Sequence, residues 1–132
     1  MKPIFTLVDY AEVSQPTKDI ATVPGLAIKK ILDQNDMTLD QMEVIEINEA
    51  FAAVTLVSTK MLAGGDEAKW RELLKKTNPN GGAIAIGHPV GASGGRILMT
   101  MMYELKRRGG GYGICGICGG LAQGDAVVIR VD

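Results

Sequence analysis

Glycine is concentrated in the second half of this chain. The sequence has 132 residues and 17 glycines, and 14 of these lie between Gly81 and Gly124. Glycine is favoured where the backbone turns tightly or where another group approaches it closely. The first 80 residues instead have the composition of ordinary α/β sequence. We therefore expect the second half to carry most of the chemistry.

Short apolar runs with strand character alternate with segments of helical spacing. The patterns predict strands at 4–10, 44–47, 112–118 and 125–131, and helices at 22–34, from Phe51 onward and at 91–108. Such alternation is typical of a mostly parallel sheet with helices on both faces, and the last two strands add an antiparallel edge. The sequence therefore predicts an α/β domain with a mixed sheet.

Length and charge exclude several classes of protein. The 14 basic and 15 acidic side chains give a formal net charge of -1, and no dense basic run is present, which argues against a nucleic-acid partner. The first apolar run ends at Asp9, which is too short for a signal-peptide core or a membrane span. We expect one domain over residues 1–132, in the cytoplasm, with no membrane partner.

Three motifs have the spacing of known sites in the wrong context. The segment 91–95 matches a hydrolase nucleophile elbow, but the single histidine, His88, precedes the serine. The segment 111–116 matches G-x-G-x-x-G but enters a strand, the reverse of a dinucleotide site. Cys115 and Cys118 lie three apart in a strand and should face opposite sides. We therefore expect no metal site, no redox pair and no covalently bound cofactor.

Three further segments place polar groups where elements end. They are Asn48-Glu49-Ala50-Phe51, Gly87-His88-Pro89 and Cys118-Gly119-Gly120. Taken singly, Asn48 fits a helix cap, His88 a loop imidazole bonded to the backbone, and Cys118 a small buried apolar residue. Loops at the carboxyl ends of neighbouring strands meet in one crevice, so the three segments can also form one site.

These three segments, together with the stretch 80–96, resemble the C-terminal domain of thiolases in order and spacing. The resemblance covers essentially the whole chain. It implies a thiolase-like α/β fold with a mixed, mostly parallel, five-stranded sheet and helices on both faces. The Asn-Glu-Ala-Phe box favours thiolases proper, since the related ketoacyl synthases have a histidine there.

The resemblance also implies a role for each of four residues. His88 would activate a nucleophilic thiol and, with a water held by Asn48, would form the oxyanion hole for the enolate of acetyl-CoA. Cys118 would be the acid/base that moves the α-proton. The backbone N–H of Gly120 would serve a second oxyanion hole, which binds the tetrahedral oxygen of the acyl group. The substrates would be acyl-CoA, acetyl-CoA and CoA, with no residues assigned to CoA binding.

The chain departs from complete thiolases in what it lacks. Complete thiolases have a similar N-terminal domain that supplies the nucleophilic cysteine, followed by a loop region that binds CoA. Cys115 does not replace that cysteine, because it lies inside a strand. The leading hypothesis is therefore the small subunit of a two-chain thiolase, inactive alone and active in a hetero-oligomer with an N-terminal-type subunit. The alternatives are a non-catalytic assembly or regulatory module and a piece of a longer enzyme.

The helix that follows His88 is unusually apolar. Residues 97–102 are apolar on nearly every side apart from Thr100. A helix of this kind is expected to be buried on both faces, and one small sheet covers only one of them. The uncovered face of this helix is therefore predicted to be an interaction surface, through which the chain binds its partner or self-associates.

Overall fold

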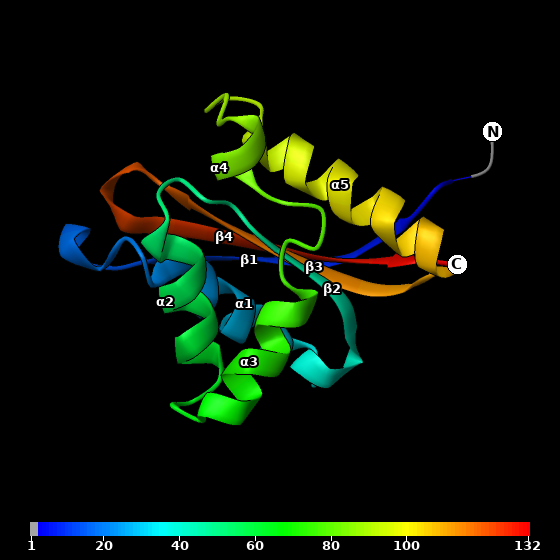
Figure 1. Cartoon of the computed structure of the whole chain (residues 1–132), viewed down its shortest axis with the longest axis horizontal. Coiled ribbons are helices and arrows are strands. Elements are labelled where there is room, and N and C mark those ends of the chain that lie inside the picture. Colours follow the sequence, from blue (N-terminus) through cyan, green and yellow to red (C-terminus); the bar gives the residue numbers. More distant parts are fainter. Residues whose placement is uncertain (1–2) are drawn as a thin grey trace.

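A computed structural model describes residues 3–132 as a single sheet with helices on both faces. Along the described chain the elements are β1 (Thr6–Ser14), α1 (Val23–Gln34), β2 (Met42–Ile47), α2 (Ala53–Leu62), α3 (Glu67–Lys76), α4 (Ala83–Ile86), α5 (Ser93–Arg108), β3 (Gly111–Gly119) and β4 (Gln123–Val131). As Figure 1 shows, α1, α2 and α3 lie on one side of the sheet, and α4 and α5 lie on the other. The α/β class and the helices on both faces are confirmed.

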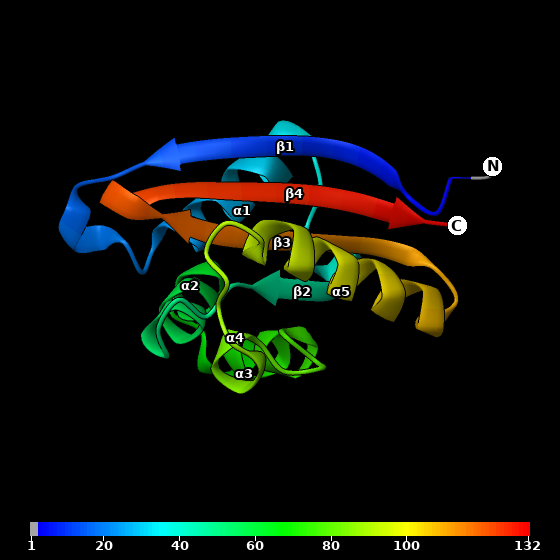
Figure 2. The same ribbon diagram turned by 90° about the horizontal axis from the view of Figure 1, so that it is seen from above.

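The strand order is β1-β4-β3-β2. β4 pairs antiparallel with both β1 and β3, and β2 pairs parallel with β3. Figure 2 shows β1, β2 and β3 pointing the same way, with β4 running in the opposite direction between β1 and β3. The expectation of a five-stranded, mostly parallel sheet is therefore wrong in two details. The described residues form four strands, and insertion of β4 leaves one parallel pairing.

Apolar side chains form a separate cluster on each face of the sheet. The cluster on the α1 side includes Ile28, Ile31 and Ile45. The cluster on the α5 side includes Ile97, Met101 and Leu105. Alternate residues of a strand point to opposite faces, so β2, β3 and β4 contribute to both clusters, whereas β1 contributes to the α1-side cluster alone.

Local sequence explains where several helices begin and end. Pro24 lies in the first turn of α1, where its missing N–H costs no helical hydrogen bond. Asp66 caps α3 by accepting a hydrogen bond from the Lys69 N–H at 3.0 Å. The segment around Trp70 is thus a regular helix. Gly109 ends α5 with a left-handed conformation, φ 96°.

Helix α5 is buried on one face only. Ile97, Met101 and Leu105 pack against the sheet, whereas Met99 and Tyr103 are 55% and 59% exposed. As expected, the sheet covers only one face of this helix, and apolar side chains remain on its outer face. None of the helices formed by residues 3–132 is long and apolar enough to cross a membrane.

Candidate active site

Asn48 is fixed at the carboxyl end of β2. It follows directly after Ile47, and its backbone N–H donates a hydrogen bond to the Gly116 carbonyl of β3 at 3.0 Å. Its side chain is completely buried. Cys118 lies two residues beyond Gly116, so the ends of the two parallel strands bring the first and third polar segments to the same edge of the sheet.

His88 reaches Asn48 from the loop between α4 and α5. The distance between Asn48 Nδ2 and His88 Nε2 is 3.4 Å, and His88 Nδ1 lies 2.5 Å from Ser93 Oγ. Ser93 Oγ in turn donates to the Pro89 carbonyl at 3.3 Å. One proton arrangement satisfies all three contacts: Nδ1 carries the proton and donates to Oγ, and Nε2 keeps its lone pair and accepts from Asn48. This tautomer presents a basic nitrogen at the site.

A second set of hydrogen bonds holds the loop that leads to the imidazole. The Glu49 carboxylate accepts from Asn78 Nδ2 at 3.3 Å and from the Ile84 N–H at 3.0 Å. Asn78 also bonds both backbone groups of Ile47, its Oδ1 accepting at 2.8 Å and its Nδ2 donating at 2.9 Å. Gly82 has no room for a Cβ, which would collide with the Glu49 carboxylate. The loop is therefore tied to the end of β2.

The two cysteines lie in different environments on opposite faces of β3. Cys118 is half-buried beside the α1-side cluster, and burial raises the pKa of its thiol. Cys115 is buried in the α5-side cluster, and burial with the nearby Glu46 carboxylate raises its pKa to about 12. The predicted separation of the two thiols is confirmed. Among residues 3–132, no three His, Cys, Asp or Glu side chains come close enough to share a metal ion.

Gly120 lies in an exposed turn just after β3. No atom lies within 4 Å of the position that a Cβ would take at this residue. The next two residues, Leu121 and Ala122, both adopt left-handed conformations, with φ 62° and 56°. The Ala122 carbonyl accepts a hydrogen bond from the Gln15 N–H at 3.0 Å, which ties this turn to the segment after β1.

The structure thus joins two of the four predicted site residues directly. Asn48 and His88 are hydrogen-bonded. Cys118 and Gly120 lie at the adjacent strand end, and within residues 3–132 no hydrogen bond links either of them to that pair. Sequence reasoning missed Ser93, which it considered only as a false hydrolase serine, and gave no role to Glu49. Serine five residues after the histidine is the signal that could have indicated the first.

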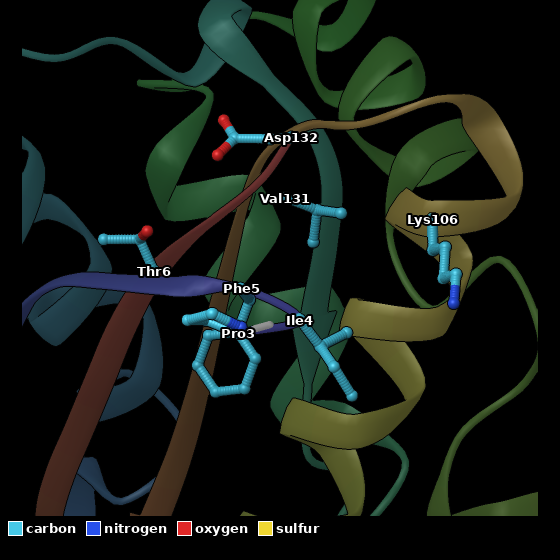
Figure 3. Close-up of a pocket in the computed structure, with 7 residues that line it drawn as sticks. All are labelled: Pro3, Ile4, Phe5, Thr6, Lys106, Val131 and Asp132. Atoms are coloured by element: carbon cyan, nitrogen blue, oxygen red, sulfur yellow. The ribbon is translucent and has the colours of Figure 1, made fainter. Parts of the chain in front are cut away.

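One cavity lies away from the predicted site residues. It has a volume of about 390 Å³ and lies where β1 begins and α5 and β4 end, at the end of the sheet opposite Asn48. Figure 3 shows the seven residues that line it, which are Pro3, Ile4, Phe5, Thr6, Lys106, Val131 and Asp132. None of the predicted site residues lines this cavity.

Comparison with known proteins gives a consistent result. Residues 1–131 match the family model of the thiolase C-terminal domain. A probable acetyl-CoA acetyltransferase of Mycolicibacterium smegmatis is 52% identical over 121 residues, which are 92% of this chain and 29% of that protein. A beta-ketoadipyl-CoA thiolase of Acinetobacter baylyi is 50% identical over 81% of this chain and 25% of its own length. The crystal structure of Acat5 thiolase from Ascaris suum in complex with coenzyme A superposes with a TM-score of 0.88 at 36% identity, covering 100% of this chain and 32% of that one.

Proposed function

The chain belongs to the thiolase family, as its C-terminal domain, and we propose that it supplies oxyanion-binding and acid/base groups to an acyl-transfer reaction on CoA thioesters. The observation that carries this proposal is the hydrogen-bonded pair of Asn48 and His88 at the end of β2, beside the end of β3 that bears Cys118. Neither the contact between the Asn48 and His88 side chains nor the Cys118 thiol is needed to build the sheet. An amide and a thiol on neighbouring strand ends, with a basic imidazole from the loop between α4 and α5, suit proton transfer and oxyanion binding.

In the cleavage direction, the reaction begins at a cysteine on a partner chain. His88 Nε2 accepts the proton of that thiol, and the thiolate attacks the keto carbon of a 3-ketoacyl-CoA. The Gly120 N–H donates to the oxyanion that forms. The carbon–carbon bond then breaks, and the oxygen of the acetyl-CoA enolate is bound by His88 and by a water on Asn48. The Cys118 thiol donates its proton to the α-carbon of this enolate, which leaves as acetyl-CoA. The CoA thiol then gives its proton to the Cys118 thiolate and attacks the acyl group, and the partner's cysteine leaves as a thiolate that regains the proton held by His88. Condensation follows the same steps in reverse.

The electrostatics of the site support two of these roles. The lone pair on His88 Nε2 follows from the direction of its contacts with Asn48 and Ser93, so the imidazole is already in the tautomer of a base. Burial raises the pKa of the Cys118 thiol. A protonated thiol is the form that can donate a proton to the leaving enolate, so the environment suits the acid role of Cys118.

We propose that the nucleophile lies on a separate, N-terminal-type thiolase subunit and that residues 1–132 form one C-terminal-type domain. The chain spans about 30% of the length of the curated relatives it matches. The buried Cys115 cannot serve instead, because its pKa is raised to about 12. A hetero-oligomer in the cytoplasm is the arrangement we expect. The next experiment separates this arrangement from a non-catalytic module, whereas a piece of a longer enzyme should behave in it as the subunit does.

The test is reconstitution. The purified chain alone should not cleave acetoacetyl-CoA with CoA, since it lacks the acyl-accepting cysteine. Mixed with a separately produced N-terminal thiolase half, it should cleave the substrate at an enzymatic rate. Turnover by the chain alone would contradict the missing nucleophile, and a folded, associated complex without turnover would favour the non-catalytic module.

Variants in the reconstituted complex assign the roles. Cys118→Ala should abolish condensation yet leave acyl-enzyme formation on the partner's cysteine measurable by mass spectrometry. His88→Ala should impair both steps, by about 100-fold or more in kcat. Cys115→Ala is the matched control and should leave turnover nearly unchanged. An essential Cys115 with a dispensable Cys118 would show that the roles are assigned to the wrong thiol.

A further inference from the structure

Two side chains of opposite charge whose charged groups are buried, Glu46 and Arg96, lie on the two elements that hold Asn48 and Ser93. Glu46 on β2 is completely buried, and neither of its carboxylate oxygens forms a hydrogen bond within the described chain. The three guanidinium nitrogens of Arg96 on α5 are also buried and form no hydrogen bond there. Ionised groups removed from water are costly unless an opposite charge compensates them. Each of these two residues is therefore the other's candidate partner.

The neighbouring charges support this pairing. Burial raises the pKa of Glu46 to about 7, the charge of Arg96 lowers it, and the carboxylates of Glu49 and Glu104 raise it. Both of those carboxylates already have hydrogen-bond partners. Glu104 binds Arg107 and Arg108, and Glu49 binds Asn78 and the Ile84 N–H. Arg96 is thus the cation that remains to stabilise the Glu46 carboxylate.

Both residues connect directly to the candidate site along their own elements. Glu46 and Asn48 lie two residues apart at the end of β2, so Glu46 is one strand repeat beneath the amide. Arg96 lies three residues after Ser93, which is almost one turn of α5, and Ser93 holds His88 Nδ1. The two charges therefore lie on β2 and α5, each within about one repeat of a residue that contacts His88.

We propose that Glu46 and Arg96 are positioning residues, which fix the first turn of α5 against the end of β2 and so set the contact between Asn48 and His88. Loss of the Glu46 charge leaves a buried cation without compensation. The guanidinium then moves toward solvent, and the first turn of α5 moves with it. Ser93 and His88 follow, and the imidazole loses its fixed tautomer. The proposal deepens the proposed function, because it concerns the same Asn48–His88 pair.

The test uses the ring nitrogens of His88 as the readout. His88 is the single histidine of the chain, so its imidazole ¹⁵N signals are unambiguous. At pH 8 the native chain should show Nδ1 protonated and Nε2 unprotonated. In Glu46→Gln the two nitrogen shifts should move toward each other, as the tautomers begin to interchange. Glu43→Gln is the matched control, since it makes the same change at an exposed position of the same strand, and it should give the native spectrum.

Folding is followed separately through the single tryptophan, Trp70, on the α3 side of the sheet. If Glu46→Gln does not fold, Arg96→Lys replaces it, since lysine keeps the charge without the planar guanidinium, and a partial shift of the His88 signals is expected. A folded variant with native His88 signals would overturn the proposal and leave the pair a purely structural feature. So would a native chain whose His88 tautomers already interchange. Because the readout is not activity, native His88 signals together with a reconstituted complex that lacks thiolase turnover would contradict the proposed function alone.

Discussion

The two ring nitrogens of His88 have different hydrogen-bond partners, Ser93 at Nδ1 and Asn48 at Nε2. This difference decides which nitrogen can act as a base. Nδ1 carries a proton and donates it in a 2.5 Å hydrogen bond to Ser93 Oγ, because Oγ uses its own proton to donate to the Pro89 carbonyl. The contact of Nε2 with the neutral amide of Asn48 is longer, at 3.4 Å. A substrate or a thiol can therefore easily replace the amide as the donor to the Nε2 lone pair. A histidine held this way is a base whose accessible nitrogen is chosen by the fold.

The two cysteines should differ strongly in reactivity. Cys118 is half-buried, whereas Cys115 is buried and its pKa is raised to about 12. Because the thiolate is the reacting form, iodoacetamide at pH 8 should alkylate Cys118 at least about 100-fold faster than Cys115. Peptide mass spectrometry of a labelling time course measures both rates. Cys118→Ser should leave only the slow reaction, and fast labelling in that variant would contradict the burial of Cys115.

Among the elements, the sequence patterns identify all four described strands and place helices at 22–34 and 91–108 to within about two residues. The apolar and β-branched runs carry that information locally. β1 extends to Ser14, beyond the expected end at residue 10. Its last residues continue to pair with β4 through their backbone groups, although exposed polar side chains interrupt the apolar run. The antiparallel pairing of β3 with β4 is predicted, but β4 is expected at the edge of the sheet, and no local pattern specifies that it inserts between β1 and β3.

For the site, the motifs predict that Asn48 and His88 lie together, and the two side chains are in contact, but the motifs leave out the residues that hold them. Ser93, Glu49 and Asn78 act through hydrogen bonds between segments 5 to 35 positions apart. Polar residues of this kind have many local explanations in a sequence, such as caps and turns. Only the fold shows which of them bind a site residue.

Close packing of β4 against α1 depends on a glycine. A Cβ on Gly124 would lie 2.5 Å from the Val23 carbonyl oxygen, which is a backbone atom that cannot rotate away. Gly124→Ala should therefore lower the free energy of unfolding by about 3 kcal/mol in urea titrations followed by Trp70 fluorescence.

Gly95 in α5 is the matched control for that substitution. No atom lies within 4 Å of the position of its Cβ, so Gly95→Ala should raise the free energy of unfolding by about 0.5–1 kcal/mol through helix propensity alone. Equal effects at the two positions would show that α1 and β4 are not in the close contact described.

For the molecule as a whole, the outer face of α5 predicts self-association of the isolated chain. Met99 and Tyr103 expose apolar surface on this face, while Met101 is fully buried against the sheet and is unsuitable as a probe. Met99→Glu should shift the chain toward monomer in sedimentation velocity across a micromolar concentration series. It should also weaken binding to an N-terminal-type thiolase half.

Leu56→Glu provides the comparison, since Leu56 is 48% exposed on α2, on the opposite side of the sheet. This variant should associate as the native chain does. If both substitutions act equally, association is a general consequence of exposed apolar residues and α5 is not its site.

The place of β4 between β1 and β3 also has a consequence for biosynthesis. β4 is made after the other three strands, and β1 pairs with it alone, residue 6 opposite residue 130. Until β4 has left the ribosome, β1 with α1 forms one fragment and the β2–β3 pair forms another, with nothing in the sheet to connect them. Contacts so distant in sequence form slowly. The nascent chain therefore presents unpaired strand edges for most of its synthesis, and in this state it should depend on chaperones more than a helical protein of equal length.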